Sequence, residues 1–260
     1  MNLIDDFKYQ GKSINVESFT PEELIEAGQV TEEAADFLAD VAKSREISGM
    51  IFGPTGSGKT TRLDTFIISN IPDNERILVI QEGDELKSKE RYPNKTIVEL
   101  YTQEGETPDS TFGISRLIED VAVLLRPDRL LVGHIGKSID GFKYLHTYGC
   151  SRWTTVSSDS AIGGLERIAK MIQEIQPGMD EIDILDEIYD LVDIIVYVDA
   201  GKITDIVELY QDDDWKNEYR PIFKHRKGEG LKRVGIISES LAIKLEDQGV
   251  DPSKWLKEVN

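Results

Sequence analysis

A glycine-rich segment near residue 55 holds the residues best suited to chemistry. Gly53-Pro54-Thr55-Gly56-Ser57-Gly58-Lys59-Thr60, here called the phosphate cradle, fits the pattern G-x-x-x-x-G-K-[ST], and Thr61 follows it. Glycines at these positions let successive backbone N–H groups turn toward phosphate oxygens. Lys59 is expected to reach the β- and γ-phosphates, and the Thr60 hydroxyl to coordinate Mg²⁺. Because four fixed positions recur by accident in about one chain of this length in a hundred, the segment predicts a nucleoside triphosphate site with ATP and Mg²⁺ as cofactors.

Hydrolysis needs a side chain that orients or deprotonates water, and usually an acid near Mg²⁺. The segment Gln81-Glu82-Gly83-Asp84-Glu85 follows a buried apolar run and offers three acids in four residues. Ligand-binding groups gather at the carboxyl ends of parallel strands, although such a cluster is also typical of a solvated loop. A second strand tip, after Leu130-Leu131-Val132, carries His134 and no acid. A lone histidine is more often a core or loop residue than a ligand.

The segments around these residues alternate between strand and helix from residue 48 onward. Short apolar runs predict buried strands at 50–52, 77–80, 96–101, 130–132 and 153–156. Helical spacing predicts helices at 61–69, 113–125, 163–175 and 182–191. A hairpin is expected at 194–209, around Asp199-Ala200-Gly201-Lys202. This alternation indicates an α/β fold with a central, mostly parallel sheet flanked by helices.

Both ends of the chain are expected to add short helices. Thr20-Pro21-Glu22-Glu23 is a capping box with proline at the first helical position, and a second helix should begin after Thr31. In that helix Phe37, Leu38 and Val41 share one face, which favours core packing over function. Segments 212–214 and 227–230 are expected as surface loops, and 237–245 as a helix. The expected division is a lead-in at 1–45, the α/β domain at 46–210 and a small C-terminal appendage at 211–260.

Composition limits the classes of function. The 260 residues are 39% hydrophobic and 30% charged, as in an ordinary soluble domain. The net charge of −19 argues against a broad grip on nucleic acid, which needs a basic face. The single Cys150 rules out an intrachain disulfide framework and suits a reducing cytoplasm. No signal peptide is expected, and no apolar run reaches the ~20 residues that span a bilayer, so any membrane association should go through a partner.

Several segments together resemble the secretion ATPases of type II and type IV systems, the conjugation and tight-adherence-pilus branch above all. The likeness covers roughly residues 18–210 and is carried, beside the phosphate cradle, by five segments: Ile71 to Ile77, Glu82 to Leu86, Leu125-Arg126-Pro127-Asp128-Arg129-Leu130-Leu131-Val132-Gly133, Thr154-Thr155-Val156 and Leu165 to Met171. The Arg-Pro-Asp-Arg strand entry combined with the cradle is much more specific than the cradle alone.

This resemblance implies a RecA-like P-loop NTPase that works in a hexameric ring, where ATP hydrolysis moves a pilus or a secretion channel. The family's water-activating glutamate falls on Glu85, which joins Lys59 as a catalytic residue, and Glu82 falls at the acidic partner position as a candidate metal ligand. Arginines that complete a neighbour's site fall among Arg76, Arg126 and Arg129. The implied partners are copies of the chain or a paralogue in the ring, and a platform protein of the inner membrane, with the chain in the cytoplasm at that membrane's inner face.

Three features depart from the family pattern. The Walker B glutamate falls on His134, which cannot replace a carboxylate in holding a Mg²⁺-bound water, and the arginine two positions later is Gly136. The family's His box falls on Ser157-Ser158-Asp159-Ser160, so its histidine is absent. The N-terminal sensing domain is reduced to about 45 residues. These differences predict slower hydrolysis with nucleotide binding intact.

The favoured function is therefore a motor subunit of type IV secretion, conjugation or pilus assembly. A nucleotide-binding structural or regulatory subunit stays open as an alternative, and it would release negligible phosphate. A small-molecule or nucleotide kinase usually carries an arginine-rich lid and an acceptor pocket, and neither is evident beyond scattered arginines. A DNA-translocating motor is disfavoured by the charge of −19.

Overall fold

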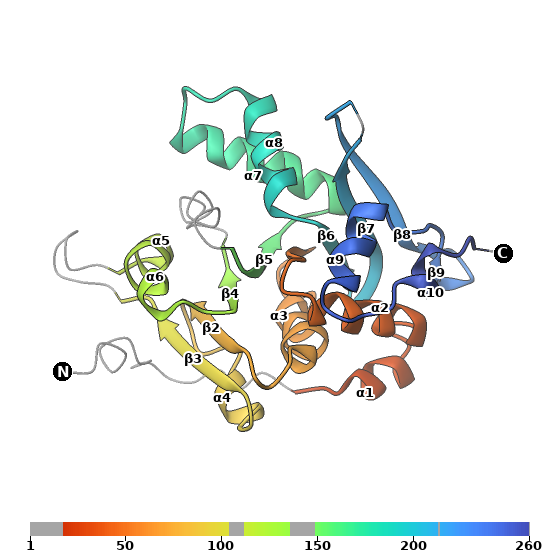
Figure 1. Ribbon diagram of the computed structural model, residues 1–260, viewed down its shortest axis with the longest axis horizontal. Helices are drawn as coiled ribbons and strands as arrows, with labels where there is room; N and C mark the ends of the chain where they lie inside the picture. The colour runs from red at the N-terminus through yellow and green to blue at the C-terminus, as the bar shows by residue number, and fades with distance from the viewer. Residues whose placement is uncertain (1–17, 104–111, 136–148, 213, 260) are drawn as a thin grey trace.

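A mixed, twisted sheet forms the centre of the molecule (Figure 1). The computed structural model describes residues 18–103, 112–135, 149–212 and 214–259. Within that part of the chain the sheet has nine strands in the order β3-β2-β4-β5-β1-β6-β7-β8-β9. The strands are β1 (Gly49–Gly53), β2 (Arg76–Gln81), β3 (Thr96–Tyr101), β4 (Arg129–His134), β5 (Ser151–Ser157), β6 (Ile194–Asp199), β7 (Lys202–Gln211), β8 (Asn217–Arg226) and β9 (Gly230–Arg233).

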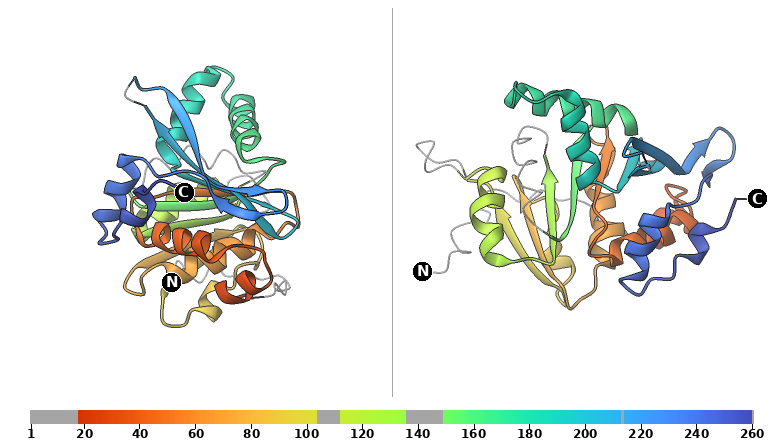
Figure 2. Two further views of the ribbon diagram at one scale, coloured as in Figure 1. Left: turned by 90° about the vertical axis from the view of Figure 1, so that its right-hand side faces the viewer. Right: turned by 45° about the horizontal axis from the view of Figure 1, so that its top comes forward.

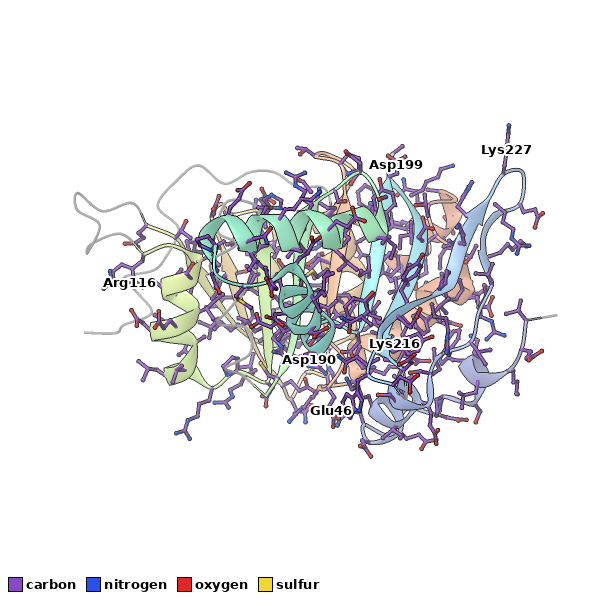
Figure 3. All side chains as sticks on the ribbon, turned by 90° about the horizontal axis from the view of Figure 1, so that it is seen from above. Glu46, Arg116, Asp190, Asp199, Lys216 and Lys227 are labelled. Atoms are coloured by element: carbon purple, nitrogen blue, oxygen red, sulfur yellow. The ribbon has the colours of Figure 1, made fainter. Side chains whose placement is uncertain are left out.

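The first six strands of the sequence pair in parallel, and the last three are added antiparallel. Parallel pairing brings the carboxyl ends of β1, β2, β4 and β5 to one edge of the sheet, where loops can meet a ligand. Figure 3 shows the two edges: Asp199, at the end of β6, lies on the opposite side of the molecule from Glu46 and Asp190, which precede β1 and β6. The expected α/β fold with a mostly parallel sheet is confirmed.

Helices cover both faces of this sheet, which gives three layers. The helical elements are α1 (Pro21–Glu26), α2 (Glu32–Lys43), α3 (Lys59–Arg62), the π-helical η2 (Leu63–Ile67), η3 (Ile68–Asn70), α4 (Ser88–Arg91), α5 (Ile114–Arg116), the π-helical η5 (Leu117–Ala122), α6 (Val123–Leu125), α7 (Ala161–Ile175), α8 (Glu181–Leu191), α9 (Glu239–Glu246) and α10 (Ser253–Leu256). In the left view of Figure 2, α2 lies on one side of the sheet and α7 and α8 lie on the other.

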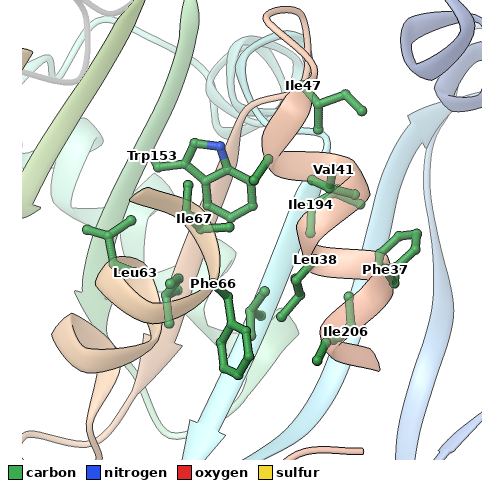
Figure 4. Close-up of a cluster of buried hydrophobic side chains, with 14 of the residues drawn as sticks. Phe37, Leu38, Val41, Ile47, Leu63, Phe66, Ile67, Trp153, Ile194 and Ile206 are labelled. Atoms are coloured by element: carbon green, nitrogen blue, oxygen red, sulfur yellow. The ribbon is translucent and has the colours of Figure 1, made fainter. Parts of the chain in front are cut away.

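Successive side chains of the strands point to opposite faces of the sheet and pack into two separate hydrophobic cores. Along β1, Ile51 points into the core under α2, while Met50 and Phe52 belong to the core under α7 and α8. The α2 stripe predicted from the sequence, Phe37 with its neighbours 38 and 41, is buried and packs against Phe66 of η2 and the strand residues (Figure 4). The helix that follows the phosphate cradle is therefore fixed on the sheet by the same core that holds α2.

Two local predictions are confirmed in detail. Thr20 and Glu23 form the reciprocal capping box of α1, with Glu23 N donating to Thr20 Oγ1 at 3.3 Å and Thr20 N donating to Glu23 Oε2 at 2.8 Å. The β6–β7 hairpin turns at Ala200 and Gly201, whose φ angles of 43° and 78° are both left-handed. Two left-handed residues are what a tight two-residue hairpin turn requires.

The strands β8 and β9 were not predicted from the sequence. Only Ile222 and Phe223 of β8 have buried apolar side chains, and they are adjacent because the pairing with β7 shifts register between Ile206 and Val207. This shift hides the alternation that normally reveals a strand. As a result the sheet continues across the expected boundary between residues 210 and 211.

The C-terminal elements pack onto α2. The rings of Phe37, Phe223 and Trp255 form a cluster, with centroids 5.6 Å apart for Phe37–Phe223 and 5.1 Å apart for Phe37–Trp255. The outermost strand β9 ends at Arg233, which donates to the backbone carbonyls of Lys254 and Lys257 at 2.7 and 3.1 Å. No described helix has the length and apolar character that crossing a bilayer requires.

Candidate nucleotide-binding site

The phosphate cradle lies between the end of β1 and the start of α3, as the sequence predicts. Gly53 and Gly58 have φ angles of 155° and 93°, which L side chains rarely adopt. A Cβ at Gly53 would stand 2.0 Å from the carbonyl oxygen of Val198, so this position also tolerates no side chain. The strand–loop–helix arrangement points the N-terminal end of the helix, with its free N–H groups, at the mouth of the loop.

Lys59 folds over the loop that precedes it. Its side chain is buried, and Nζ donates to the carbonyl oxygens of Gly53 and Pro54 at 2.9 and 2.8 Å. Burial lowers the pKa of Lys59, and the charge of Glu85 opposes this shift. An ammonium held by two neutral carbonyls can exchange them for phosphate oxygens, which make stronger, charge-assisted hydrogen bonds.

The acidic segment after β2 reaches the cradle through Glu85. Thr60 Oγ1 donates to Glu85 Oε2 at 3.3 Å. The buried Gln81 side chain shapes this segment, because its Oε1 accepts from the backbone N–H groups of Glu85 and Leu86 at 3.3 and 3.2 Å. Asp84 instead accepts a hydrogen bond from the Tyr101 hydroxyl at 2.9 Å. The carboxylate of Glu85 is thus the acid of this segment that touches the cradle.

The tips of β4 and β5 form the facing wall. A register shift between Val132 and His134 ends the regular pairing of β4 with β5. Thr155 Oγ1 donates to the carbonyl oxygen of Gly133 and so holds the residue before His134. Ser157 Oγ lies 3.5 Å from Thr55 Oγ1 of the cradle. Gly136, the other departure at this tip, lies outside the described residues.

The surroundings of His134 favour the neutral form of its imidazole. Partial burial of the imidazole lowers the pKa of His134 below its ordinary value near 6.5, and the ammonium of Lys59 lowers it further. The opposing effects of the Thr155 backbone and the charges of Glu82 and Glu85 are smaller. A neutral imidazole can donate or accept one hydrogen bond at each nitrogen, but it brings no negative charge to the site.

These groups surround one hollow of about 230 Å³. It is lined by Thr55, Gly56, Lys59, Thr60, Gln81, Glu82, Gly83, Glu85, Gly133, His134, Thr155 and Ser157. The structure therefore brings together Lys59, Thr60, Glu82, Glu85, His134 and Ser157, which the sequence singled out in separate segments. It adds Gln81 and Thr155, which sequence reasoning missed. The signal available for both was a polar side chain at the end of a buried strand.

The rest of the expected His box does not enter this hollow. Ser160 caps α7, with its Oγ accepting from Gly163 N at 3.0 Å, and Ser158 Oγ donates to the carbonyl oxygen of Ser160 at 2.7 Å. Serines in these places stabilise the start of a helix. Only Ser157 of the segment 157–160 lines the hollow.

The three candidate arginines lie near the opposite edge of the sheet, at or just before the amino ends of β2 and β4. Arg76 is exposed and pairs with Asp128 at 3.7 Å, and Arg126 is exposed with a left-handed φ of 44°. Arg129 is only 1% exposed; it pairs with the buried Glu75 and donates to the carbonyls of Lys43 and Ser44 at the end of α2. This burial and these partners give Arg129 a structural role within the chain and argue against the expectation that it completes a neighbour's site.

The site also suits a hard divalent cation that arrives with a polyphosphate. Among the described residues, no three His, Cys, Asp or Glu side chains form a ready metal cluster. Mg²⁺ does not require one, since it usually takes one or two protein oxygens together with phosphate oxygens and water. The adjoining Thr60 hydroxyl and Glu85 carboxylate, with Glu82 lining the same hollow, supply such oxygens.

A glycine-rich cradle between the first parallel strand and its helix, with the acidic loop after β2 at its mouth, defines a P-loop nucleotide-binding protein of the RecA-like α/β type. The model of the family described as "Type II/IV secretion system protein" matches residues 12–197. This match covers well over half of the chain, which therefore belongs to that family.

Relatives within the family include secretion and conjugation proteins. The chain is 32% identical over 170 residues to "Type IV secretion system protein VirB11" of Bartonella quintana, covering 63% of this chain and 46% of the relative. It is 28% identical over 160 residues to "Putative conjugal transfer protein Rv3659c" of Mycobacterium tuberculosis, covering 56% and 44%. The chain thus spans about half the length of these relatives.

A solved structure shares the fold. The VirB11 ATPase of the Brucella suis type IV secretion system, in complex with sulphate, aligns with a TM-score of 0.55 and 21% identity, over 88% of this chain and 60% of that chain. At this level of identity the likeness concerns the arrangement of the sheet and helices alone.

Proposed function

We propose that this chain binds MgATP in the phosphate cradle and hydrolyses it slowly as a motor subunit of a type IV secretion, conjugation or pilus-assembly system. The observation that carries the proposal is the contact between Thr60 and Glu85, which brings an acid of the loop after β2 to the mouth of the cradle that holds Lys59. Family membership and the relatives' names support the biological setting.

Four residues that line the hollow have roles in this reaction. Lys59 leaves the carbonyls of Gly53 and Pro54 and binds β- and γ-phosphate oxygens. When bound, Mg²⁺ neutralises phosphate charge, and the Thr60 hydroxyl with Glu82 would hold it. Glu85 accepts a proton from a water whose oxygen attacks the γ-phosphorus, while the bond from that phosphorus to the bridging oxygen breaks and ADP leaves.

His134 favours a slow reaction, and it supports a second candidate function. The imidazole lines the hollow at the strand tip where the resembled family carries a carboxylate. Phosphoryl transfer depends on positioning and electrostatics, so the loss of one carboxylate is expected to cost orders of magnitude in rate. The second candidate is therefore a subunit that binds ATP tightly and does not turn it over.

Assembly and location follow from the same proposal. We expect a hexameric ring of identical chains, or of this chain with a paralogue, docked on an inner-membrane platform protein from the cytoplasm. Arg76 and Arg126 are the exposed arginines proposed to reach a neighbour's nucleotide. The mass of the protein in solution, measured with and without MgATP, tests whether the ring forms. A monomer under both conditions would exclude the ring.

Phosphate release and nucleotide affinity test the reaction. Lys59→Ala is expected to remove most MgATP affinity, while Glu85→Gln should keep affinity within about three-fold and slow phosphate release by about 100-fold. Glu90→Gln, an exposed change on α4 outside the hollow, is the matched control and should change neither. Tight MgATP binding with background release in the wild type would select the non-hydrolysing subunit. A lack of magnesium-dependent affinity would overturn both candidates.

A further inference from the structure

Arg62 is a buried cation directly beside the phosphate cradle. It lies at the end of α3, three residues after Lys59, and only 4% of it is exposed. Its backbone N–H donates to the Gly58 carbonyl at 3.1 Å. A Cβ at Gly58 would stand 2.6 Å from Nη1 of Arg62, so the guanidinium packs against the cradle's last glycine.

The partners of this guanidinium are all neutral. Its Nη2 donates to the side-chain oxygen of Gln29 in the α1–α2 loop and to the carbonyl of Gly201 in the β6–β7 turn. Its Nε is buried without a hydrogen-bond partner. Within the described residues no carboxylate pairs with Arg62, and burial lowers its pKa with no acid opposing the shift. Arginine nevertheless stays protonated in proteins, so the charge remains.

The other buried cations of the described chain differ in this respect. Arg129 pairs with Glu75, and the charge of Glu85 acts on Lys59. A buried charge without a counter-charge is costly. Arg62 therefore adds positive potential beneath the cradle while lacking an acid to balance it.

We propose that Arg62 is a binding residue for polyphosphate, whose anionic charge compensates this guanidinium through space. The inference deepens the proposed function and rests on it. Attraction between charges in a partly buried site falls slowly with distance and grows with the ligand's charge. Arg62 should therefore favour ATP over ADP. The competing explanation is a purely structural role, in which Arg62 only holds Gln29, Gly201 and the cradle together.

Charge and shape can be separated by two substitutions. Arg62→Met keeps the length of the side chain and removes its charge, and Arg62→Lys keeps the charge and loses the fork of donors. Calorimetry with MgATP and MgADP should show Arg62→Met weakening ATP binding about ten-fold and ADP binding less, with Arg62→Lys within about three-fold of wild type. Urea unfolding without nucleotide should show Arg62→Met at least as stable as wild type, since a buried unbalanced charge has been removed.

Arg226→Met, the same change at an exposed arginine at the end of β8 and outside the hollow, is the control and should leave affinity unchanged. If Arg62→Met and Arg62→Lys weaken ATP binding equally, the role of Arg62 is structural and the inference is overturned. The same holds if Arg62→Met lowers the stability of the protein and leaves its affinity for ATP unchanged. Failure of the wild type itself to bind MgATP would instead overturn the proposed function, so the two failures are distinguishable.

Discussion

His134 is the residue on which the rate of the proposed reaction depends. Its neutral imidazole shares the hollow with Lys59, Glu82 and Glu85, so the strand tip contributes no charge there. A carboxylate at the same tip would order a metal-bound water through charge-assisted hydrogen bonds.

We therefore expect His134→Glu to raise phosphate release at saturating MgATP at least ten-fold. His225→Glu, the same substitution at an exposed position of β8, is the control and should leave the rate unchanged. A rate that stays the same or falls in His134→Glu would show that the imidazole is not what limits hydrolysis.

A site residue could be predicted from the sequence when its role depends on its immediate neighbours in the chain. The cradle from Gly53 to Thr60 is continuous, so its conformation follows from its own glycines. Thr155 acts on the neighbouring strand β4, so its role appears only when the strands pair. Gln81 holds the loop that follows its own strand, and the apolar run before it does not reveal that contact. The buried pairing of Arg129 was not predictable, because its partner Glu75 lies 54 residues away and burial of an arginine is not visible in the sequence.

The junction of α2, β2 and β4 depends on one buried ion pair. Arg129 and Glu75 are both nearly inaccessible, and Arg129 also binds the free carbonyls at the end of α2. Arg129→Met is expected to lower the free energy of unfolding by about 1–3 kcal/mol, because the carbonyls at the end of α2 lose their buried donor and Glu75 keeps only the partly exposed Arg45, at 3.0 Å, as its partner. Urea denaturation measures this. Arg76→Met breaks an exposed pair and should cost at most about 1 kcal/mol; equal losses in the two variants would contradict the role of burial.

The packing of α9 on β7 should depend on pH through Glu208. Burial raises the pKa of Glu208, and the hydrogen bonds that Ser238 donates to it oppose this shift. The folded state thus binds this proton more tightly than the unfolded state, so the stabilising contribution is present below the ordinary pKa near 4.3 and is lost as pH rises through the raised value. The stability of wild type relative to Glu208→Gln should therefore fall as the pH rises above the ordinary glutamate pKa near 4.3. Thermal unfolding of both proteins, with exposed Glu239→Gln as the control, tests the sign.

Helices and strands could be predicted from the sequence where the segment has one or both faces apolar. The central strands and α2 follow this rule, and so do the helices over the second core. Strand β8 does not, because Pro221 and charged residues interrupt it and the register shift puts its two buried residues side by side. Its place in the sheet is set by pairing with β7, which the sequence of β8 alone does not reveal.

At the scale of the molecule, the C-terminal residues behave as part of the sheet. Phe223 of β8 packs against both Phe37 of α2 and Trp255 of α10. Phe223→Ala should therefore destabilise the whole chain by about 3–5 kcal/mol in a single urea transition. Tyr219→Ala, at a half-exposed position of the same strand, should cost far less. A separate early transition in Phe223→Ala would instead favour an appendage that unfolds on its own.

The short outer strand β9 has a consequence for how copies of the chain can meet. It spans four residues, and its last one, Arg233, is bound to two carbonyls near the chain's own end and to Glu33. A short edge strand with charged side chains resists pairing with a strand of another molecule, and this limits aggregation. We expect subunits joining on this flank to recognise each other through side chains and loops, which permits them to separate and re-form contacts without breaking a backbone ladder.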